Sequence, residues 1–186
     1  MKLKDKLESM HACSEAIKWV GNRGIKTAWR DCPRGDWMLW IAGRLEIDHK
    51  LLVLAACDCA ETALKYAPDD DRPAKCIEVT RKWCEGKATT DDVRAAQCGA
   101  YAAAYVAYAA ADVADVAVSA AYAAADVADA AYAAADVADV ADVAVSAAYA
   151  ASYASYAAYA ARKSAHKLCA DLVRARIPYE TIKALL

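Results

Sequence analysis

The sequence YAAAYVAYAAADVADVAVSAAYAAADVADAAYAAADVADVADVAVSAAYAASYASYAAYA, residues 101–160, decides the fold of this chain. Thirty-one of its sixty residues are Ala, and it contains no Lys, Arg, Gly or Pro. Because Ala favours helix more than any other residue and no helix breaker is present, the whole stretch is predicted to be helical. A single helix of this length would extend about 90 Å. We therefore expect a hairpin of two long helices with its turn within residues 126–135.

Two regular stripes of Tyr and Asp run along these predicted helices. Their members are three and four residues apart, a spacing that places each stripe on one helix face. The first stripe comprises Tyr101, Tyr105, Tyr108, Asp112, Asp115, Ser119, Tyr122, Asp126 and Asp129, and the second comprises Tyr132, Asp136, Asp139, Asp142, Ser146, Tyr149, Tyr153 and Tyr156.

The Asp residues of these stripes need an explanation, because like charges one helical turn apart destabilise an isolated helix by about 0.2–0.5 kcal/mol per pair. Three interpretations are open. The Asp residues form a solvated face that keeps an Ala-rich hairpin soluble, or they pair internally with Arg and Lys residues elsewhere in the chain. Alternatively, they form a contact face, in which Tyr supplies rigid contact area and the carboxylates attract a basic partner.

The formal net charge of −2 conceals a marked asymmetry along the chain. Residues 1–100 carry a net charge of +1, residues 101–160 of −7 and residues 161–186 of +4. The length and composition predict an all-α, multi-helix bundle that forms a single domain over residues 1–186. Its expected parts are a Trp- and Cys-rich helical core (1–100), the Ala-rich hairpin (101–160) and a basic C-terminal helix and tail (161–186).

The predicted location of the protein is the cytoplasm. No apolar signal-peptide core follows the first lysines, and Asp interrupts the Ala-rich stretch too often for a membrane-spanning helix. The chain has 8 Cys. In a chain of this length without a signal peptide we expect them to be reduced thiols that act as small buried hydrophobic residues.

Outside the Ala-rich stretch, the apolar spacing and the capping residues predict a series of shorter helices. Asp48 is the expected N-cap of one of them, and Thr89 or Thr90 that of another. Asp58 and Glu61 are expected on a solvated stripe. The predicted helices cover residues 2–20, 25–31, 36–45, 50–66 and 72–83. A further helix begins near residue 93 and continues into the Ala-rich stretch. Another leads out of that stretch to about residue 176 and is followed by a final turn at 179–186.

Four tryptophans, Trp19, Trp29, Trp37 and Trp40, lie close together in a chain that has no Phe. Such a concentration of aromatic mass is typical of a hydrophobic core, so we expect these residues to form the core of the N-terminal part. An aromatic-ligand site is the alternative.

No motif in the chain indicates catalysis or metal binding. Cys57 and Cys59 are two residues apart and would point away from each other on a helix, so they cannot ligate one metal ion together. His11, His49 and His166 stand alone, without a metal-binding or nucleophile spacing. We expect no enzyme activity, no catalytic residue, no cofactor and no metal; a hydrolase that uses His49 or His166 is the remaining enzymatic alternative.

Several segments resemble one protein family. They are TAWRDCPRGDWMLW at residues 27–40, LAACDCA at 54–60, DRP at 71–73 followed by Ile77 and Trp83, and CADLVRARIP at 169–178. Together they are similar to the immunity-five-like immunity proteins of bacterial and phage genomes, whose members also carry an Ala-rich helical segment. The resemblance implies a cytoplasmic helical protein that neutralises a toxin by binding it, without catalytic residues.

The predicted function is therefore that of a non-enzymatic inhibitor that blocks a toxin or defence effector. The partner is expected to be a protein with a basic surface, with no nucleic acid and no membrane involved, and the Ala-lined helices also suit pairing between two copies of the chain. The alternatives are a phage counter-defence protein that sequesters a small molecule in a Tyr-lined cleft, and a purely structural helical domain. The predicted contact residues are Asp112, Asp115, Asp126, Asp129, Asp136, Asp139, Asp142, Tyr105, Tyr108, Tyr149 and Tyr153.

Overall fold

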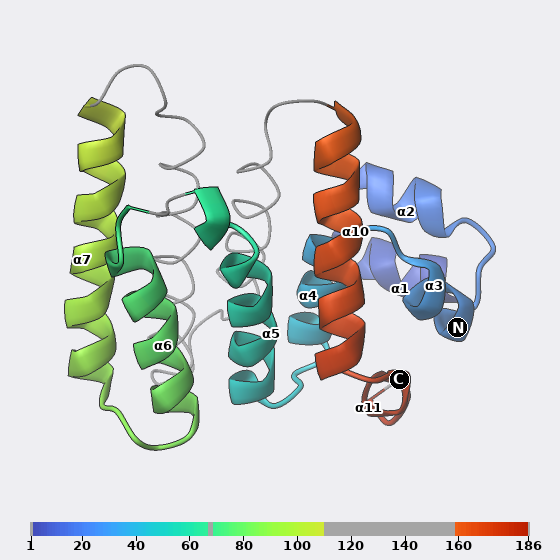
Figure 1. Ribbon diagram of the computed structural model, residues 1–186. Helices are drawn as coiled ribbons and strands as arrows, with labels where there is room; N and C mark the ends of the chain where they lie inside the picture. Colours follow the sequence, from blue (N-terminus) through green and yellow to red (C-terminus); the bar gives the residue numbers. More distant parts are fainter. Residues whose placement is uncertain (1, 67–68, 110–158, 186) are drawn as a thin grey trace.

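The computed structural model describes residues 2–66, 69–109 and 159–185, and in these residues the chain is all-α, as predicted (Figure 1). Residues 110–158 of the predicted Ala-rich hairpin, with its turn within residues 126–135, lie outside the described residues. The described helices are α1 (Leu3–Ser9), α2 (Ser14–Val20), α3 (Ile25–Asp31), α4 (Gly35–Arg44), α5 (His49–Glu61), α6 (Arg72–Cys84), α7 (Thr90–Ala109), α10 (Tyr159–Arg176) and α11 (Tyr179–Lys183), with a 3-10 turn at Leu64–Tyr66.

The predicted first helix over residues 2–20 is wrong: the chain forms α1 and α2 instead. His11 adopts a positive φ of 60°. The N–H of His11 donates to the carbonyl of Glu8 at 3.0 Å, and the N–H of Ala12 donates to that of Leu7 at 3.0 Å. This pair of bonds is a Schellman motif, which ends a helix and is usually built on Gly. Because His occupies the left-handed position here, no Gly or Pro in the sequence signals the break.

The predicted helix starts agree with the structure where side-chain caps were expected. Asp48 accepts a hydrogen bond from the N–H of Leu51 at 3.0 Å at the start of α5. Thr89 and Asp92 cap α7 reciprocally, because the Asp92 N–H donates to Thr89 Oγ1 at 3.1 Å and the Thr89 N–H donates to Asp92 Oδ2 at 2.8 Å. These bonds satisfy backbone donors that the first helical turn leaves without partners.

The central helix is α5, as its nearly continuous apolar sequence predicted. It packs against α4, α6 and α10, and α6 in turn packs against α7 (Figure 1). Leu52, Val53 and Cys57 on α5 are completely buried, together with Val173 and Ile177 at the C-terminal side of the chain. The helix is shorter than predicted, because the chain leaves it after Glu61 and makes a 3-10 turn.

The crossing of α4 and α10 brings two helix backbones close together. A Cβ atom at Gly35, the first residue of α4, would lie only 2.7 Å from the Cβ of Cys169 and 2.9 Å from the backbone nitrogen of Ala170 on α10. Only Gly fits at such a distance. None of the described helices is long and apolar enough to span a membrane.

Candidate functional site

The predicted contact face falls almost entirely outside the described residues. Tyr105 and Tyr108 belong to the last turns of α7. The remaining predicted contact residues lie between the end of α7 and the start of α10 and are outside the described residues: Asp112, Asp115, Asp126, Asp129, Asp136, Asp139, Asp142, Tyr149 and Tyr153.

The two helices that flank this segment are firmly packed into the described part. Val93 and Ala100 anchor α7, and Ala170 and Val173 anchor α10, each with at most 1% of its surface exposed. Figure 1 shows the C-terminal end of α7 and the N-terminal end of α10 on the same side of the helical layer. The chain therefore leaves the described part and returns to it on one side.

Seven arginines of the described part are paired with carboxylates of the described part. They include both arginines in the last turn of α10. The pairs are Arg30 with Asp31, Arg34 with Asp36, Arg72 with Asp70, Arg81 with Asp58 and Glu61, Arg94 with Asp91, Arg174 with Asp171, and Arg176 with Asp58. These arginines therefore have carboxylate partners that do not come from the Tyr/Asp stripes.

Asp58 is not on a solvated stripe, contrary to the prediction. Its carboxylate lies 2.8 Å from Arg81 and accepts two hydrogen bonds from Arg176, at 2.8 and 2.9 Å, and only 14% of the side chain is exposed. The hydrogen bond to Asp58 raises the pKa of Arg176. The carboxylate thus joins α5, α6 and α10. The apolar spacing could not reveal this role, because Arg176 is far away in the sequence.

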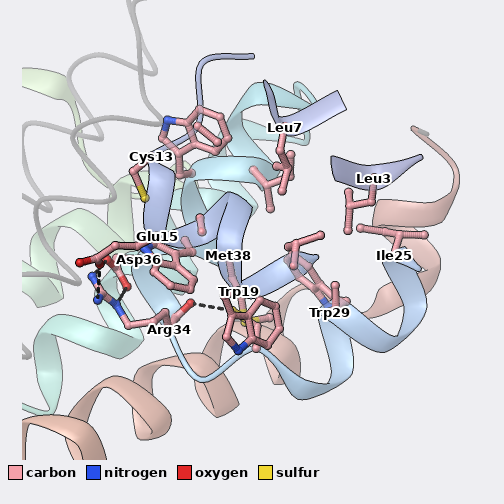
Figure 2. Close-up of a pocket in the computed structure, with 18 residues that line it drawn as sticks. Leu3, Leu7, Cys13, Glu15, Trp19, Ile25, Trp29, Arg34, Asp36 and Met38 are labelled. Carbon is pink, nitrogen blue, oxygen red and sulfur yellow. Dashed lines mark hydrogen bonds and ion pairs between the residues drawn. The ribbon is translucent and has the colours of Figure 1, made fainter. Parts of the chain in front are cut away.

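The tryptophan cluster is part of the core and also forms the wall of a cavity. Trp29 is 4% exposed and donates from Nε1 to the carbonyl of Ile177 at 3.2 Å. Trp19, Trp37 and Trp40 are partly buried. All four tryptophans line a half-open cavity of about 320 Å³ between the α1–α2 pair and the helices α3 and α4 (Figure 2). The prediction of a core is thus confirmed, and the alternative of a ligand site gains a matching cavity.

The wall of this cavity, which we call the Trp cleft, is almost entirely apolar. The rings of Trp19 and Trp37 are tilted by 54° with their centroids 6.2 Å apart. Leu3 and Leu7 on α1 face the same space (Figure 2). The apolar spacing of α1 could not identify them as cavity residues, because a buried side chain has the same pattern whether its neighbours fill the space or not.

One end of the Trp cleft carries charged groups that neutralise each other. Arg34 donates from Nε to Asp36 at 2.8 Å, and its guanidinium lies 4.8 Å from the ring centroid of Trp37. Asp36 is 5% exposed, and its Oδ1 is 3.8 Å from Nδ1 of His166 on α10. Glu15 on α2 lies 4.0 Å from Arg34. The network ties α2, α4 and α10 together at the start of α4.

The cysteines are free thiols, and most of them are buried as predicted. Cys32, Cys57, Cys59, Cys76 and Cys169 are buried, whereas Cys13 and Cys98 are exposed. Burial raises the pKa of Cys32 and of Cys84 to about 11, and it raises the pKa of Cys57 further. These three thiols are therefore protonated at neutral pH and are poor nucleophiles.

The histidines occupy separate places: His11 is at the end of α1, His49 begins α5 and His166 is buried on α10. Within the described part of the chain, no three His, Cys, Asp or Glu side chains come together as a metal site.

No protein-family model, no curated protein and no solved structure matches this chain. The resemblance to the immunity-five-like proteins therefore stays a prediction.

Proposed function

We propose that this protein is a non-enzymatic inhibitor of the immunity type, which binds a basic protein partner through the Tyr/Asp stripes of residues 101–160. The observation that carries the proposal is the pairing of Arg34, Arg72, Arg81, Arg174 and Arg176 with carboxylates of the described part. This pairing counts against the interpretation in which the stripes neutralise these arginines. It leaves seven Asp side chains in a segment that contains no Lys or Arg.

A partner with a basic surface fits this charge. Opposite charge on two proteins raises their association rate, up to about 10⁸–10⁹ M⁻¹s⁻¹ at low salt. The tyrosines add contact area at a low cost in side-chain entropy, because the ring has few rotatable bonds. A row of carboxylates at regular spacing also imitates the charge of a nucleic-acid backbone. A toxin or defence effector whose basic site holds nucleic acid would then be blocked by direct competition.

The anchoring of α7 and α10 supports the same proposal. The segment between α7 and α10 is joined at both ends to helices that are packed into the core at Ala100 and Val173. Because both ends are fixed, a partner that binds there meets a lower cost in conformational entropy than it would at a free chain end.

A pull-down from a lysate of the native host tests the proposal. The bait is the wild-type chain beside a variant in which Asp112, Asp115, Asp126 and Asp129 are replaced by Ala. A control variant with the same change in charge replaces the exposed residues Glu8, Glu78, Glu85 and Glu180 by Ala.

We expect mass spectrometry to find one protein that the wild type and the control retain and that the Asp variant loses. Retention by the wild type and the control should fall as the salt concentration rises, so that their advantage over the Asp variant narrows, because salt screens exposed charges. Equal retention by all three baits would exclude this face, and circular dichroism of each bait would exclude unfolding as the cause.

A further inference from the structure

A second cavity lies beside the Trp cleft and has the opposite chemistry. It measures about 520 Å³ and is lined by four basic residues, Lys2, Lys4, Lys6 and Arg23. Leu3 and Ile25 line both cavities. Figure 2 shows these two side chains next to each other at one end of the Trp cleft, with Arg34 and Asp36 at the other end. The uncharged end of the Trp cleft therefore borders the basic cavity.

The basic cavity has little negative charge of its own. None of its nine lining residues is acidic. Asp5 accepts a hydrogen bond from the backbone N–H of Lys2 at 3.3 Å, and Glu8 lies 3.7 Å from Lys4. Two carboxylates thus stand near four cations. Because a hollow lined by one sign of charge concentrates ions of the opposite sign, this cavity favours an anion.

Arg23 and Trp19 connect the two cavities. The Arg23 guanidinium lies 4.8 Å from the centroid of the Trp19 ring and donates a hydrogen bond from Nη1 to the Trp19 carbonyl oxygen. Trp19 lines the Trp cleft, whereas Arg23 lines the basic cavity. Gly21 makes the turn between them with a φ of 49°. A fixed positive charge therefore stands at the boundary between the apolar and the basic space.

We propose that the two cavities together bind one amphipathic anion, a soluble molecule with a single apolar body and one carboxylate, sulfonate or phosphate head. The body would occupy the Trp cleft against Trp19 and Trp37, and the head would be held by Arg23 and Lys6. An apolar cavity of about 150 Å³ accommodates benzene. The cleft of about 320 Å³ is therefore large enough for a medium-length acyl chain or two fused aromatic rings.

The charged end of the Trp cleft sets the orientation of this ligand. Arg34 and Asp36 already bind each other at that end. The head is therefore placed at the Leu3 and Ile25 end, where four cations stand. This site is separate from the Tyr/Asp stripes and does not depend on the proposed function.

Ligands with the same ten-carbon chain and different heads test the proposal. Decanoate, decan-1-ol and decyltrimethylammonium are titrated into the full chain below their micelle concentrations, with calorimetry and tryptophan fluorescence as readouts. We expect saturable binding of decanoate and at least about tenfold weaker binding of decyltrimethylammonium, because the head of the latter meets like charge. Equal binding of these two ligands, or no saturable binding of decanoate, would overturn the proposal.

Two variants assign the roles of the cavities. Lys6→Gln combined with Arg23→Gln should weaken decanoate binding at least about tenfold and leave decan-1-ol binding unchanged. Lys75→Gln combined with Lys82→Gln, two exposed residues of α6, is the matched control and should change neither. Ala12→Trp, at the partly exposed rim of the Trp cleft, should abolish the binding of both ligands.

If the basic residues bind a membrane surface and not a soluble anion, the protein should bind anionic vesicles but not decanoate. Sedimentation with phosphatidylglycerol vesicles, without saturable binding of decanoate, would assign the basic residues to a lipid surface and overturn the proposal. Thermal unfolding of each variant distinguishes a lost site from a lost fold.

Discussion

The crossing of α4 with α10 and the contact of α1–α2 with α3–α4 solve the same packing problem differently. At the first contact, Gly35 meets Cys169 and Ala170, and no room is left even for a methyl group. At the second, Trp19, Trp37 and Trp40 meet leucines and leave a cavity of about 320 Å³. Small side chains let two backbones approach closely, whereas large rigid rings fill space only where their shapes match. The chain therefore has a dense centre beside a hollow N-terminal layer.

The largest expected difference between the two regions is the loss of stability when a leucine is truncated to alanine. Leu52 is completely buried on α5, and Leu52→Ala should cost about 2–5 kcal/mol of the free energy of unfolding. Leu3 is only partly buried beside the cavity, so Leu3→Ala should cost less than about 1 kcal/mol. Urea denaturation measures both. Equal costs would mean that the N-terminal layer is packed as densely as the centre.

The addition of a single methyl group tests the dense crossing. Gly35→Ala should destabilise the protein by about 1–3 kcal/mol, because the new Cβ overlaps Cys169. The control is Gly99→Ala within α7, where the nearest atom to a new Cβ is 3.9 Å away. There, the better helix propensity of Ala should stabilise the protein by about 0.5–1 kcal/mol. Denaturation midpoints that shift in the same direction for both variants would contradict the close approach of α4 and α10.

Removal of one carboxylate charge should destabilise the protein more at the centre than at the surface. Asp58→Asn leaves the partly buried Arg81 and Arg176 without their shared carboxylate and should cost about 1–2 kcal/mol. Asp171→Asn removes an ion pair whose carboxylate is 48% exposed and should cost at most about 0.5 kcal/mol. The two variants are compared by thermal unfolding. A larger loss for Asp171→Asn would show that Asp58 does not join α5, α6 and α10.

The smallest expected effect is a pH dependence at Asp171. Its pKa is lowered from 3.8 by hydrogen bonds from Lys167 and Arg174. A lowered folded-state pKa contributes stability above the unfolded value that is lost as the pH falls through the folded value. As the pH falls below about 4, wild type should therefore lose up to about 0.5 kcal/mol more than Asp171→Asn. Parallel stability curves for the two proteins would contradict this account.

Local chemistry in the sequence was enough to predict much of the scaffold. The predicted bounds of α3 match the structure, and the caps at Asp48 and Thr89 lie where short side chains can reach the backbone. The break at His11 was missed because this residue has a positive φ that Gly normally supplies, whereas the break at Glu46, which also has a positive φ, falls between two predicted helices. Propensity describes an average residue and cannot show where tertiary packing overrides it.

Features that depend on distant residues could not be predicted. Asp58 was expected to face solvent, and its partner Arg176 belongs to the other end of the chain. The four tryptophans indicated apolar mass but not the cavity, because the volume depends on the angle between helix pairs. The predicted contact residues from Asp112 to Tyr153 lie outside the described residues, so the Tyr/Asp face stays a prediction.

The salt dependence of binding to the captured partner tests the central claim most directly. Isothermal titration compares wild type with the variant in which Asp112, Asp115, Asp126 and Asp129 are replaced by Ala, at several salt concentrations. We predict that the wild-type Kd rises about tenfold between about 0.05 and about 0.2 M salt and that the variant binds more weakly with a shallower salt dependence. The same Kd and the same salt dependence for both proteins would contradict an inhibitor that acts through this acidic face.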